Sequence, residues 1–435
     1  MRVLVLGATG FIGRHVTAAL LAAGHDVVAG GRRAEEARRR FPAIGTLACD
    51  LARDTDPAVW VPRLAGIDAV VNAAGLLRGP DIAAVHAAGP AALFAACAAA
   101  GVTRVIHISA ISADDAAGTD YAATKLRGEA ALRAQTSLDW VILRPSLVWH
   151  AGSYGGTSLL RGLAGLPGIL LLPGAGDAAF QPIHADDLAR CVGDLLADHR
   201  LRQVTLEPAG PEVLCLRTIL LRLRDWLDLP PPRLIVAVPL PLVALLARLG
   251  DVFGRGPVSS NALRQMRHGN TGDAAGFARA IGWVPQTMAQ ALARQPSHVQ
   301  DRWQARLYWL RPAVRFVLAL LWLASGLVGL LPQSTAAALT VLTGPVLAGL
   351  GLPASLALPL AAGFSVLDIA LGLGLLLRRP GIGWLTLAQL GVVLGYTLVL
   401  TAAQPGLWLE AYGPLLKNLP ILVLVCVHWA LDDDR

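Results

Sequence analysis

Apolar positions along the chain follow two different patterns. Through the first half, short and wholly apolar runs alternate with longer segments of helical period, as in strands buried on both faces and separated by helices. This alternation predicts an α/β fold with a doubly wound parallel sheet and right-handed crossovers, whose ligands bind beyond the carboxyl ends of the strands. The predicted strands are residues 3–6, 26–29, 45–49, 69–72, 105–108 and 140–143, and an alanine-rich helix is predicted at 83–100.

The C-terminal part is apolar over much longer stretches, and residues 316–367 hold no charged side chain. Four stretches approach the roughly 20 residues that a helix needs to cross a bilayer. We therefore predict an all-α four-helix transmembrane domain at 312–431. The predicted spans are about 312–331, 354–377, 383–403 and 415–431, and the run 336–352, with Gly344 and Pro345 inside it, predicts a re-entrant or interfacial helix.

A proline-interrupted stretch lies between these two parts. We assign residues 1–230 to the sheet domain and residues 231–300, with parts of 150–175, to a small substrate lobe and linker. Residues 234–249 are apolar but shorter than a span, which predicts an amphipathic, interfacial helix that closes the substrate pocket. The apolar character of this lobe favours a lipid-like substrate.

Composition narrows the class of protein. Of 435 residues, 54% are hydrophobic and 15% charged, which excludes a disordered chain and a wholly soluble one, because soluble domains carry roughly 25% charge. The net charge is +7 without a basic stripe between aromatics, so we expect membrane lipid rather than nucleic acid as a partner. The five cysteines form no CxxC pair or disulfide framework, which favours a reducing cytoplasm.

Positive charges predict the orientation in the membrane. They precede the first predicted span, separate the second from the third and open the fourth, whereas the loops 332–353 and 404–416 have none. We expect a multi-pass protein of the cell inner (cytoplasmic) membrane with the N-terminal domain and the C-terminus in the cytoplasm. The charges are those of Arg302, Arg306, Arg311, Arg315, Arg378, Arg379 and Lys417.

A glycine-rich turn follows the first predicted strand and opens a helix. The first glycine permits a tight turn, the second lets the backbone approach a pyrophosphate, and the third lets the helix pack on the strand. Unpaired N–H groups and the helix dipole then face the phosphates, although a glycine-rich turn without a ligand stays an alternative. The residues of this predicted NAD(P)-binding turn are Gly7, Ala8, Thr9, Gly10, Phe11, Ile12 and Gly13.

The end of the second strand bears on the choice of cofactor. An NAD site places an acidic side chain there for the ribose hydroxyl, but this chain has Gly30, Gly31, Arg32 and Arg33. Guanidinium groups suit the 2′-phosphate of NADP, and Arg14 on the first helix could assist. We therefore predict NADP(H) over NAD(H); the alternative is that the two arginines begin a solvated helix.

Tyr121 and Lys125 lie four residues apart at the start of the helix after the fifth strand, so they share one helix face. An ammonium group favours the phenolate and lowers the pKa of the phenol, which gives a proton donor and acceptor near neutral pH. Lys125 can also hold a ribose hydroxyl. An exposed surface pair is the alternative.

These motifs together resemble the extended or atypical short-chain dehydrogenase/reductases, which are NAD(P)-binding Rossmann proteins similar to NAD-dependent epimerases and dehydratases. The resemblance covers roughly residues 1–300. It implies that Tyr121 and Lys125 are the catalytic pair, that Asp50 and Leu51 lie near the adenine, and that other residues line the cofactor. The matching stretches are 7–13, 50, 72–75, 121–125, 143–149 and 181–190, and the cofactor-lining residues are Ala73, Ala74, Gly75 and Pro145.

One position departs from this family. Its members place a Ser or Thr just beyond the fifth strand to hydrogen-bond the substrate oxygen, and the strand register puts Ala110 there. Ser109 or Ser112 is the expected substitute, with Ser112 slightly favoured. Because atypical members include proteins that bind the cofactor without known turnover, Ala110 favours that possibility.

Two histidine positions raise the question of a metal. His184, Asp186 and Asp187 offer ligand types, but no second ligand cluster accompanies them. We expect no metal, with one of the two aspartates capping the helix that follows. His107 is expected to be a hydrogen-bonded histidine of its strand.

Asp368 is the only acidic residue within a predicted span, and Gln389 in the next span is a candidate partner. Such residues are costly in a membrane, so a functional membrane site and a packing contact both stay open. The stretches 363–380 and 411–424 resemble the DoxX-like membrane family, and the resemblance covers 312–431. It implies a membrane redox setting.

These observations predict a membrane-anchored NADP-dependent oxidoreductase that acts on an apolar or lipid-soluble carbonyl, alcohol or quinone. Two alternatives stay open. One is a non-catalytic NAD(P)H-binding scaffold or assembly protein that resembles the nucleotide-binding accessory subunit of respiratory complex I. The other is a nucleotide-sugar epimerase or dehydratase that uses the same residues. No oligomeric state follows from the sequence.

Overall fold

The computed structural model describes residues 1–435 except 43, 115, 117, 153–154, 254–257, 350, 378–382, 412 and 433–435. The predicted arginine pair at 378–379 therefore lies outside the described residues. The chain divides into two compact units, Met1–Ala305 and Arg306–Arg435, which are taken separately below.

A seven-stranded sheet forms the centre of the first unit, with the order β11-β6-β5-β4-β1-β2-β3 and every neighbouring pair parallel. Strands 3-2-1-4-5-6 in this order are the arrangement of a doubly wound dinucleotide-binding fold, so the predicted fold class is confirmed. The strands are β1 (Arg2–Leu6), β2 (Asp26–Gly31), β3 (Gly45–Ala48), β4 (Ala69–Asn72), β5 (Arg104–Ile108), β6 (Asp139–Leu143) and β11 (Val204–Leu206).

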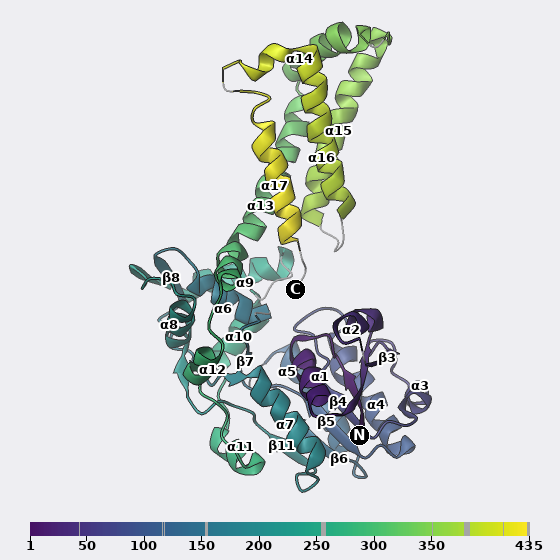
Figure 1. Cartoon of the computed structure of the whole chain (residues 1–435), viewed down its shortest axis with the longest axis vertical. Coiled ribbons are helices and arrows are strands. Elements are labelled where there is room, and N and C mark those ends of the chain that lie inside the picture. Colours follow the sequence, from purple (N-terminus) through teal and green to yellow (C-terminus); the bar gives the residue numbers. More distant parts are fainter. Residues whose placement is uncertain are drawn as a thin grey trace. The chain divides into compact units, whose positions relative to one another are not determined.

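Helices cover both faces of the sheet (Figure 1). Because side chains alternate along a strand, Val3 and Val5 of β1 join one core with helices α1 and α7, whereas Leu4 and Leu6 join the other core with α3 and α4. The helices of this part are α1 (Phe11–Ala22), α2 (Ala34–Arg40), α3 (Pro57–Trp60), η1 (Val61–Leu64), η2 (Ala84–Ala88), α4 (Gly89–Ala100), α5 (Asp120–Arg133) and α7 (Ala185–Ala197).

The small lobe has three two-stranded sheets and its own core of β7, β8, α6, α8 and α12 residues. The prediction of one helix over 234–249 is wrong in its first part. Residues 234–238 form strand β13 beside β8, and Pro239 precedes the helix α9, because the β-branched run LIVAV suits a strand better than a helix.

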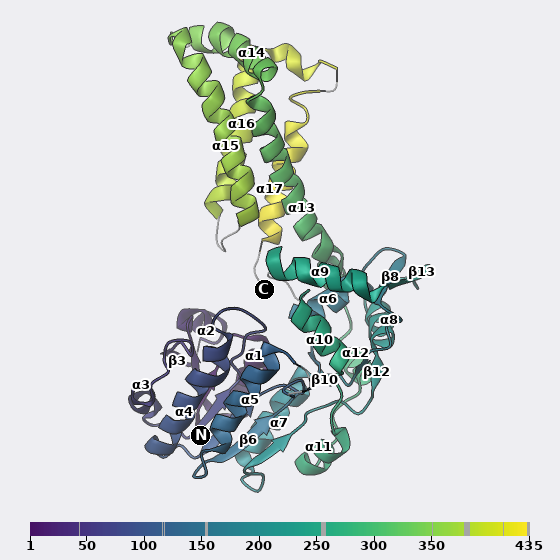
Figure 2. The same cartoon turned by 180° about the vertical axis from the view of Figure 1, so that it is seen from behind.

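The elements of this lobe, also visible from behind in Figure 2, are β7 (Val148–Trp149), α6 (Gly155–Ala164), β8 (Ile169–Pro173), β9 (Ala179–Phe180), β10 (Ile183–His184), β12 (Leu214–Cys215), α8 (Leu216–Trp226), β13 (Leu234–Val238), α9 (Leu240–Phe253), α10 (Ser260–His268), α11 (Ala274–Ile281) and α12 (Met288–Arg294).

The second unit is helical. Three helical stretches of the described residues are long and apolar enough to span a membrane: Val299–Gly329, Ala354–Leu377 and Gly383–Ala403. The fourth predicted span is a helix of only 14 residues, Asn418–Leu431, which is shorter than a typical span. The helices of the second unit are α13 (Val299–Gly329), α14 (Pro332–Val341), η4 (Leu342–Ala348), η5 (Ala354–Leu356), α15 (Ala357–Leu377), α16 (Gly383–Ala403), η6 (Pro405–Trp408) and α17 (Asn418–Leu431).

Few of the apolar side chains of these helices point into the unit. Leu318 and Trp322 of α13 pack against residues of α15, α16 and α17, whereas Leu320, Leu387 and Leu398 are more than 65% exposed. A surface of this kind is unfavourable in water and suits a hydrocarbon environment. The unit is therefore suited to membrane association.

Candidate functional site

The turn between β1 and α1 packs closely against its surroundings. Gly7 has φ +74°, and a Cβ there would lie 2.9 Å from Ala74 at the end of β4. A Cβ on Gly13 would lie 2.0 Å from the Gly7 carbonyl oxygen. Both positions therefore exclude a side chain, the first by conformation and the second because α1 packs directly on the turn.

This geometry fits a dinucleotide phosphate. Helix α1 begins at Phe11, and its N-cap, Gly10, provides no side-chain hydrogen bond. No side chain therefore caps the positive end of the helix dipole, which favours an anion there. The remaining turn residues, Ala8, Thr9 and Ile12, lie in the same segment. The predicted cofactor turn thus has a suitable conformation.

The three predicted arginines differ in their surroundings. Arg14 Nε donates to the Gly10 carbonyl at 3.2 Å, so its side chain folds back along the helix. Arg32 and Arg33 follow β2 and are exposed, and Arg33 forms a 3.1 Å ion pair with Glu36. Arg33 is also the N-cap residue of α2, so both the phosphate-binding and the helix-starting interpretations remain compatible with its position.

Other predicted cofactor residues lie at strand ends along the same edge of the sheet. Asp50 follows β3, where its carboxylate accepts from the Ala52 N–H at 3.0 Å, and Leu51 is buried. Asn72, at the end of β4, fixes the Ala73–Gly75 segment by accepting from the Ala74 N–H at 3.2 Å. Pro145 follows β6, and its carbonyl accepts from the Ile111 N–H at 3.0 Å.

Tyr121 and Lys125 lie on the first turns of α5, as predicted. Lys125 is 4% exposed, and its Nζ donates to the Ile108 carbonyl at 3.0 Å. A Cβ on Gly75 would lie 3.4 Å from this Nζ, so the ammonium faces the backbone beyond β4. Burial lowers the pKa of Lys125 to about 8.

The prediction that Lys125 lowers the pKa of Tyr121 is wrong. Burial raises the pKa of Tyr121 to about 12, because the phenol is desolvated and its ring packs edge-on against His86, with centroids 5.3 Å apart. Burial therefore keeps Tyr121 in its protonated form at neutral pH.

His86 is a site residue that sequence reasoning missed. It lies in the π-helical turn η2 and is 1% exposed. Its Nε2 accepts from the Leu76 N–H at 3.0 Å, and its Nδ1 lies 3.0 Å from Thr124 Oγ1. Since burial and Lys125 lower the pKa of His86 to about 3, the ring is neutral and holds the segment after β4 against α5.

Ser109 is committed to a buried ionic network. Its hydroxyl donates to Glu129 Oε1 at 2.5 Å, and Glu129 also accepts two hydrogen bonds from Arg144, at 2.8 and 2.6 Å. Arg133 adds a 2.8 Å contact to the same carboxylate. Ser109 therefore faces α5, and this network, which the sequence did not indicate, fixes α5 to the end of β6.

Ser112 is 4% exposed and lies between two residues that line an open pocket of about 340 Å³, Ile111 and Ala113. This volume is within the range of small-molecule sites. The pocket contains charged side chains, which differs from the predicted apolar substrate pocket. Its other lining residues are Asp114, Leu126, Arg144, Glu207, Gly269 and Thr271.

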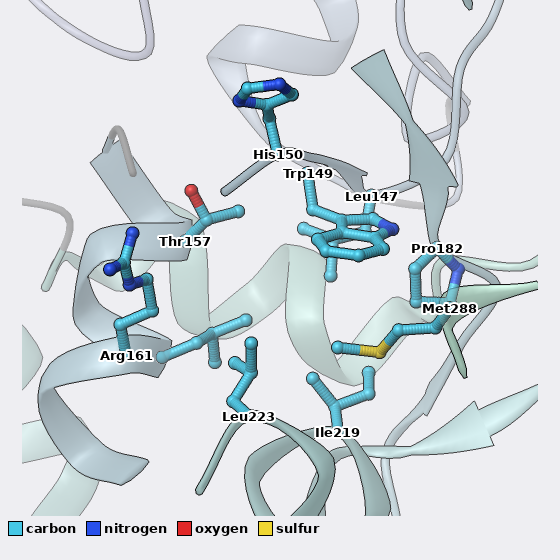
Figure 3. Close-up of a pocket in the computed structure, with 10 residues that line it drawn as sticks. Leu147, Trp149, His150, Thr157, Arg161, Pro182, Ile219, Leu223 and Met288 are labelled. Carbon is cyan, nitrogen blue, oxygen red and sulfur yellow. The ribbon is translucent and has the colours of Figure 1, made fainter. Parts of the chain in front are cut away.

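A second cavity lies within the small lobe and is apolar. Trp149, Ile219, Leu223 and Met288 converge on it, whereas the His150 ring points away from them (Figure 3). Its volume is about 20 Å³, which is room for about one water molecule. This cavity is too small for a substrate in the present conformation.

His150 turns instead toward His15 of α1 and Asp186 of α7. His15 Nδ1 lies 3.0 Å from Asp186 Oδ1, and His150 Nε2 lies 3.9 Å from the same oxygen. His184 caps α7 by accepting from the Asp186 N–H at 3.4 Å. The prediction that Asp186 or Asp187 caps this helix is therefore wrong; both are in its first turn. His107 of β5 forms a hydrogen bond with Asn72 of the neighbouring strand β4 at 3.2 Å, so it is a hydrogen-bonded histidine of its strand, as expected.

Asp368 of the second unit is 4% exposed and accepts hydrogen bonds from Ser325 at 2.7 Å and Tyr396 at 3.0 Å. Gln389 is not its partner: the Gln389 side chain accepts from Trp322 Nε1 at 3.0 Å. Asp368 and Gln389 therefore form hydrogen bonds with different residues and not with each other.

Comparison with known proteins agrees with the two-part architecture. Residues 7–160 match the NAD(P)H-binding family and residues 319–426 match the DoxX-like family. A 2′-dehydrokanamycin reductase of Streptomyces kanamyceticus is 30% identical over 258 residues, which cover 53% of this chain and 68% of that protein. The chain belongs to the short-chain dehydrogenase/reductases, an NAD(P)-binding oxidoreductase family. This dehydrogenase/reductase carries in addition a DoxX-like domain.

Two further relatives cover smaller shares of the dehydrogenase/reductase. A 2-alkyl-3-oxoalkanoate reductase of Stenotrophomonas maltophilia is 32% identical over 35% of this chain and 52% of its own length. The 40 kDa subunit of the mitochondrial NADH-ubiquinone oxidoreductase of Neurospora crassa is 29% identical over 48% of this chain and 55% of its own length.

Solved structures share the fold of the first unit. MoeE5 in complex with UDP-glucose and NAD superimposes with a TM-score of 0.52 at 21% identity, over 70% of this chain and 99% of that chain. DesIV, the dTDP-glucose 4,6-dehydratase of Streptomyces venezuelae, gives 0.51 at 22% identity, over 71% of this chain and 98% of that chain.

Proposed function

We propose that this protein is a membrane-associated NADP(H)-dependent oxidoreductase that acts on a carbonyl or alcohol carbon of a lipid-soluble molecule, quinones included. The observation that carries the proposal is the position of Lys125. Its buried ammonium lies beside the Gly75 backbone and one helix turn after Tyr121, while the phosphate-binding turn lies at the neighbouring strand β1 of the same sheet edge.

A bound NADPH would supply the hydride in such a reaction. Tyr121 would hold the proton that moves to or from the substrate oxygen. With a pKa of about 12 the phenol is protonated at neutral pH, so Tyr121 would act as the proton donor when a carbonyl substrate is reduced.

Lys125 would stabilise the phenolate that remains after proton transfer. Its pKa of about 8 leaves it mostly protonated at pH 7, and the surrounding low dielectric strengthens its attraction for the developing negative charge. His86 would position both residues, because it bridges Thr124 on α5 and Leu76 after β4.

The preference for NADP(H) rests on Arg32 and Arg33. Both follow β2 at the place where an NAD site has an acid, and both are exposed, so their guanidinium groups can reach a 2′-phosphate. The Arg33–Glu36 ion pair is exposed at the arginine, which is 77% accessible, and such pairs are weak enough to exchange for a phosphate.

The lipid-soluble substrate is supported by the DoxX-like unit, with its exposed apolar helices, and by the relative that reduces 2-alkyl-3-oxoalkanoates. We expect the membrane to be the cell inner membrane, with the first unit on the cytoplasmic side, where NADPH is available. The C-terminus is expected on that side if α17 crosses the bilayer.

The test is NADPH oxidation by the full-length protein in lipid vesicles, with membrane lipid extracts and quinones as acceptors. We expect turnover that Tyr121→Phe reduces at least about 100-fold, because the positioned acid contributes 10²–10⁴-fold. Equal rates for both proteins would remove Tyr121 from the mechanism.

A second candidate is a cofactor-binding accessory protein without turnover. Ala110 at the usual Ser or Thr position and the commitment of Ser109 to Glu129 favour it, as does the similarity to the respiratory complex I subunit. NADPH binding without any oxidation across the acceptor panel, together with co-purification with respiratory complex subunits, would support this candidate over the enzyme.

The nucleotide-sugar epimerase or dehydratase remains a third candidate, favoured by the charged pocket beside Ser112. A sugar presents hydroxyl groups, and the carboxylates of Asp114 and Glu207 could accept hydrogen bonds from them. This candidate would be supported if the protein converted a nucleotide sugar with catalytic amounts of NAD and reduced none of the lipid acceptors.

A further inference from the structure

Four polar side chains from distant parts of the chain meet where α1, β7 and α7 come together. His15 lies on α1, His150 follows β7, Asp186 is in the first turn of α7, and Gln295 follows α12. The ligand atoms of His15, His150 and Asp186 all lie within 4.8 Å of one another. The oxidoreductase mechanism above uses none of these residues.

The separations are close to those between the ligands of one metal ion. Zinc binds imidazole nitrogen and carboxylate oxygen at roughly 2.0–2.2 Å, so the ligands of a tetrahedral site are about 3.4 Å apart. His15 Nδ1 and Asp186 Oδ1 are 3.0 Å apart, and His150 Nε2 and Asp186 Oδ1 are 3.9 Å apart. The two imidazole rings have centroids 4.2 Å apart, so small side-chain rotations bring all three atoms to one ion.

Gln295 adds an amide group to the same cluster. Its buried Oε1 has no partner within ordinary hydrogen-bond distance among the described residues, although the side chain also interacts with His184. Its Nε2 lies 3.5 Å from His150 Nε2. A buried amide oxygen without a partner is unfavourable. Rotation of the amide group by half a turn, which exchanges O and N, would place this oxygen beside the His150 nitrogen and direct it toward the same ion.

His184 supports the arrangement of Asp186. Its Nδ1 lies 3.7 Å from Asp186 Oδ2 and also accepts from the Asp186 N–H, and its ring lies 5.0 Å from that of His150. His184 therefore fixes the backbone of Asp186 at the start of α7, whereas the hydrogen bond that orients its carboxylate comes from His15. Asp186 is the one carboxylate among the proposed ligands and offsets part of the charge of a divalent ion.

We propose that His15, His150 and Asp186 bind one divalent transition-metal ion of the Zn²⁺ class, with Gln295 or water completing the coordination. Two imidazoles and a carboxylate suit zinc and its neighbours better than Mg²⁺ or Ca²⁺, which prefer oxygen ligands. The ion would join α1, the segment after β7 and the start of α7. Its role is structural: it fixes the small lobe to the dinucleotide-binding sheet.

The experiment uses the full-length protein in detergent, with any histidine tag removed, after treatment with a chelator. Zn²⁺ is added in steps and protein-bound zinc is measured by mass spectrometry after desalting; Co²⁺ provides an optical readout of the ligands. We expect one ion per chain, a visible Co²⁺ absorption band, and a Tm higher by at least about 3 °C at saturating Zn²⁺.

His150→Ala is the decisive variant, because it removes one proposed ligand and leaves the His15–Asp186 hydrogen bond in place. We expect it to weaken zinc binding at least about 100-fold, which is more than the loss of a supporting hydrogen bond costs. Asp186→Asn should do the same. The control is His199→Ala, an exposed histidine with a side chain 54% accessible, which should leave binding unchanged.

Two results would overturn the proposal. One is chelated wild-type protein that binds no stoichiometric zinc. The other is equal zinc binding by His150→Ala, His199→Ala and the wild type, which would reduce the His15–Asp186 pair to an ordinary hydrogen bond. Neither result bears on NADPH turnover, so the proposed function is tested separately.

Discussion

Ser109 donates a 2.5 Å hydrogen bond to Glu129, a carboxylate with no exposed surface that Arg144 also binds through two nitrogens. The serine nearest to the end of β5 is thus used to fix helix α5. An enzyme of this family needs a hydroxyl for the substrate oxygen, and among Ser109, Ala110 and Ser112 this leaves Ser112. The enzymatic function requires the Ser112 hydroxyl to bind the substrate oxygen, whereas the accessory function does not.

We expect Ser112→Ala to lower kcat for NADPH oxidation by about 10–100-fold, because it removes one hydrogen bond to the developing charge. Ser109→Ala should lower Tm slightly, through the loss of about 1–2 kcal/mol of hydrogen bonding to a charged group, with kcat nearly unchanged. Steady-state kinetics of the two variants provides the comparison. The opposite order of effects would show that Ser109 leaves Glu129 when substrate binds.

Glu129→Gln should destabilise the first unit by about 3 kcal/mol, because the amide leaves the guanidinium of Arg144 without its counter-charge in a mostly buried position. Urea unfolding followed by tryptophan fluorescence would measure this. The matched control is Glu36→Gln. Its carboxylate pairs with Arg33 and Arg40 but is 27% accessible, against 0% for Glu129, so the loss should cost less than about 1 kcal/mol. Equal losses would mean that the Glu129 network is no more stabilising than a surface pair.

Activity should fall as pH rises through about 8. The lowered pKa of Lys125 means that its ammonium, which stabilises the phenolate, loses its proton there rather than near 10.5. Lys125→Arg should keep whatever activity it has to higher pH, since arginine stays charged. Lys417 is the only other lysine of the chain, and Lys417→Arg should not move the profile. A profile that is flat to pH 10 in the wild type contradicts this role.

Acid should destabilise the first unit through His86. In the unfolded chain a histidine binds a proton below about pH 6.5, whereas His86 in the folded protein does so only near pH 3. Between these values the unfolded state binds more protons, so stability falls as pH falls. This histidine alone should cost about 2 kcal/mol between pH 7 and pH 5.

The variant His86→Gln can keep both hydrogen bonds without titrating. Its stability should therefore decline less steeply over that pH range than the stability of the wild type. His199→Gln, at an exposed position, is the control and should follow the wild type. Parallel pH profiles for all three proteins would show that His86 becomes protonated in the folded state.

In the membrane unit, Asp368 and Tyr396 should be energetically coupled, and Asp368 and Gln389 should not. Double-mutant cycles of Asp368→Asn with Tyr396→Phe should give a coupling of about 0.5–2 kcal/mol, whereas Asp368→Asn with Gln389→Ala should be additive within about 0.5 kcal/mol. Thermal stability in detergent is the measurement. Coupling of Asp368 to Gln389 instead would mean that the membrane environment rearranges these contacts.

The parts of the site that could be predicted from the sequence are those held together by local spacing. The glycines of the phosphate turn fall within seven residues, and Tyr121 and Lys125 share one helix face. The positions of strands β1 to β6 followed as well, because buried parallel strands are continuous apolar runs, whereas the edge strand β11 was not predicted. These features depend on the chain's own periodicity and on backbone geometry.

The parts that could not be predicted join residues far apart in the chain. His86 bonds Thr124 across 38 positions, and His15 bonds Asp186 across 171, so no motif marks either pair. The Tyr121 pKa was expected to fall because Lys125 is near in sequence, but burial of the phenol raises it. Similarly, Asp368 finds Ser325 and Tyr396 through helix packing that hydropathy does not report.

The central claim is that a phosphorylated dinucleotide binds at the turn before α1, with Arg32 and Arg33 selecting NADPH. Isothermal titration calorimetry on the full-length protein tests it most directly, with NADPH and NADH titrated into the wild type, Arg32→Ala/Arg33→Ala, and the control Arg39→Ala. The account predicts one saturable site per chain that binds NADPH at least about 10-fold more tightly than NADH, a preference lost only in the double variant. Absence of binding heat with either reduced nucleotide would contradict it.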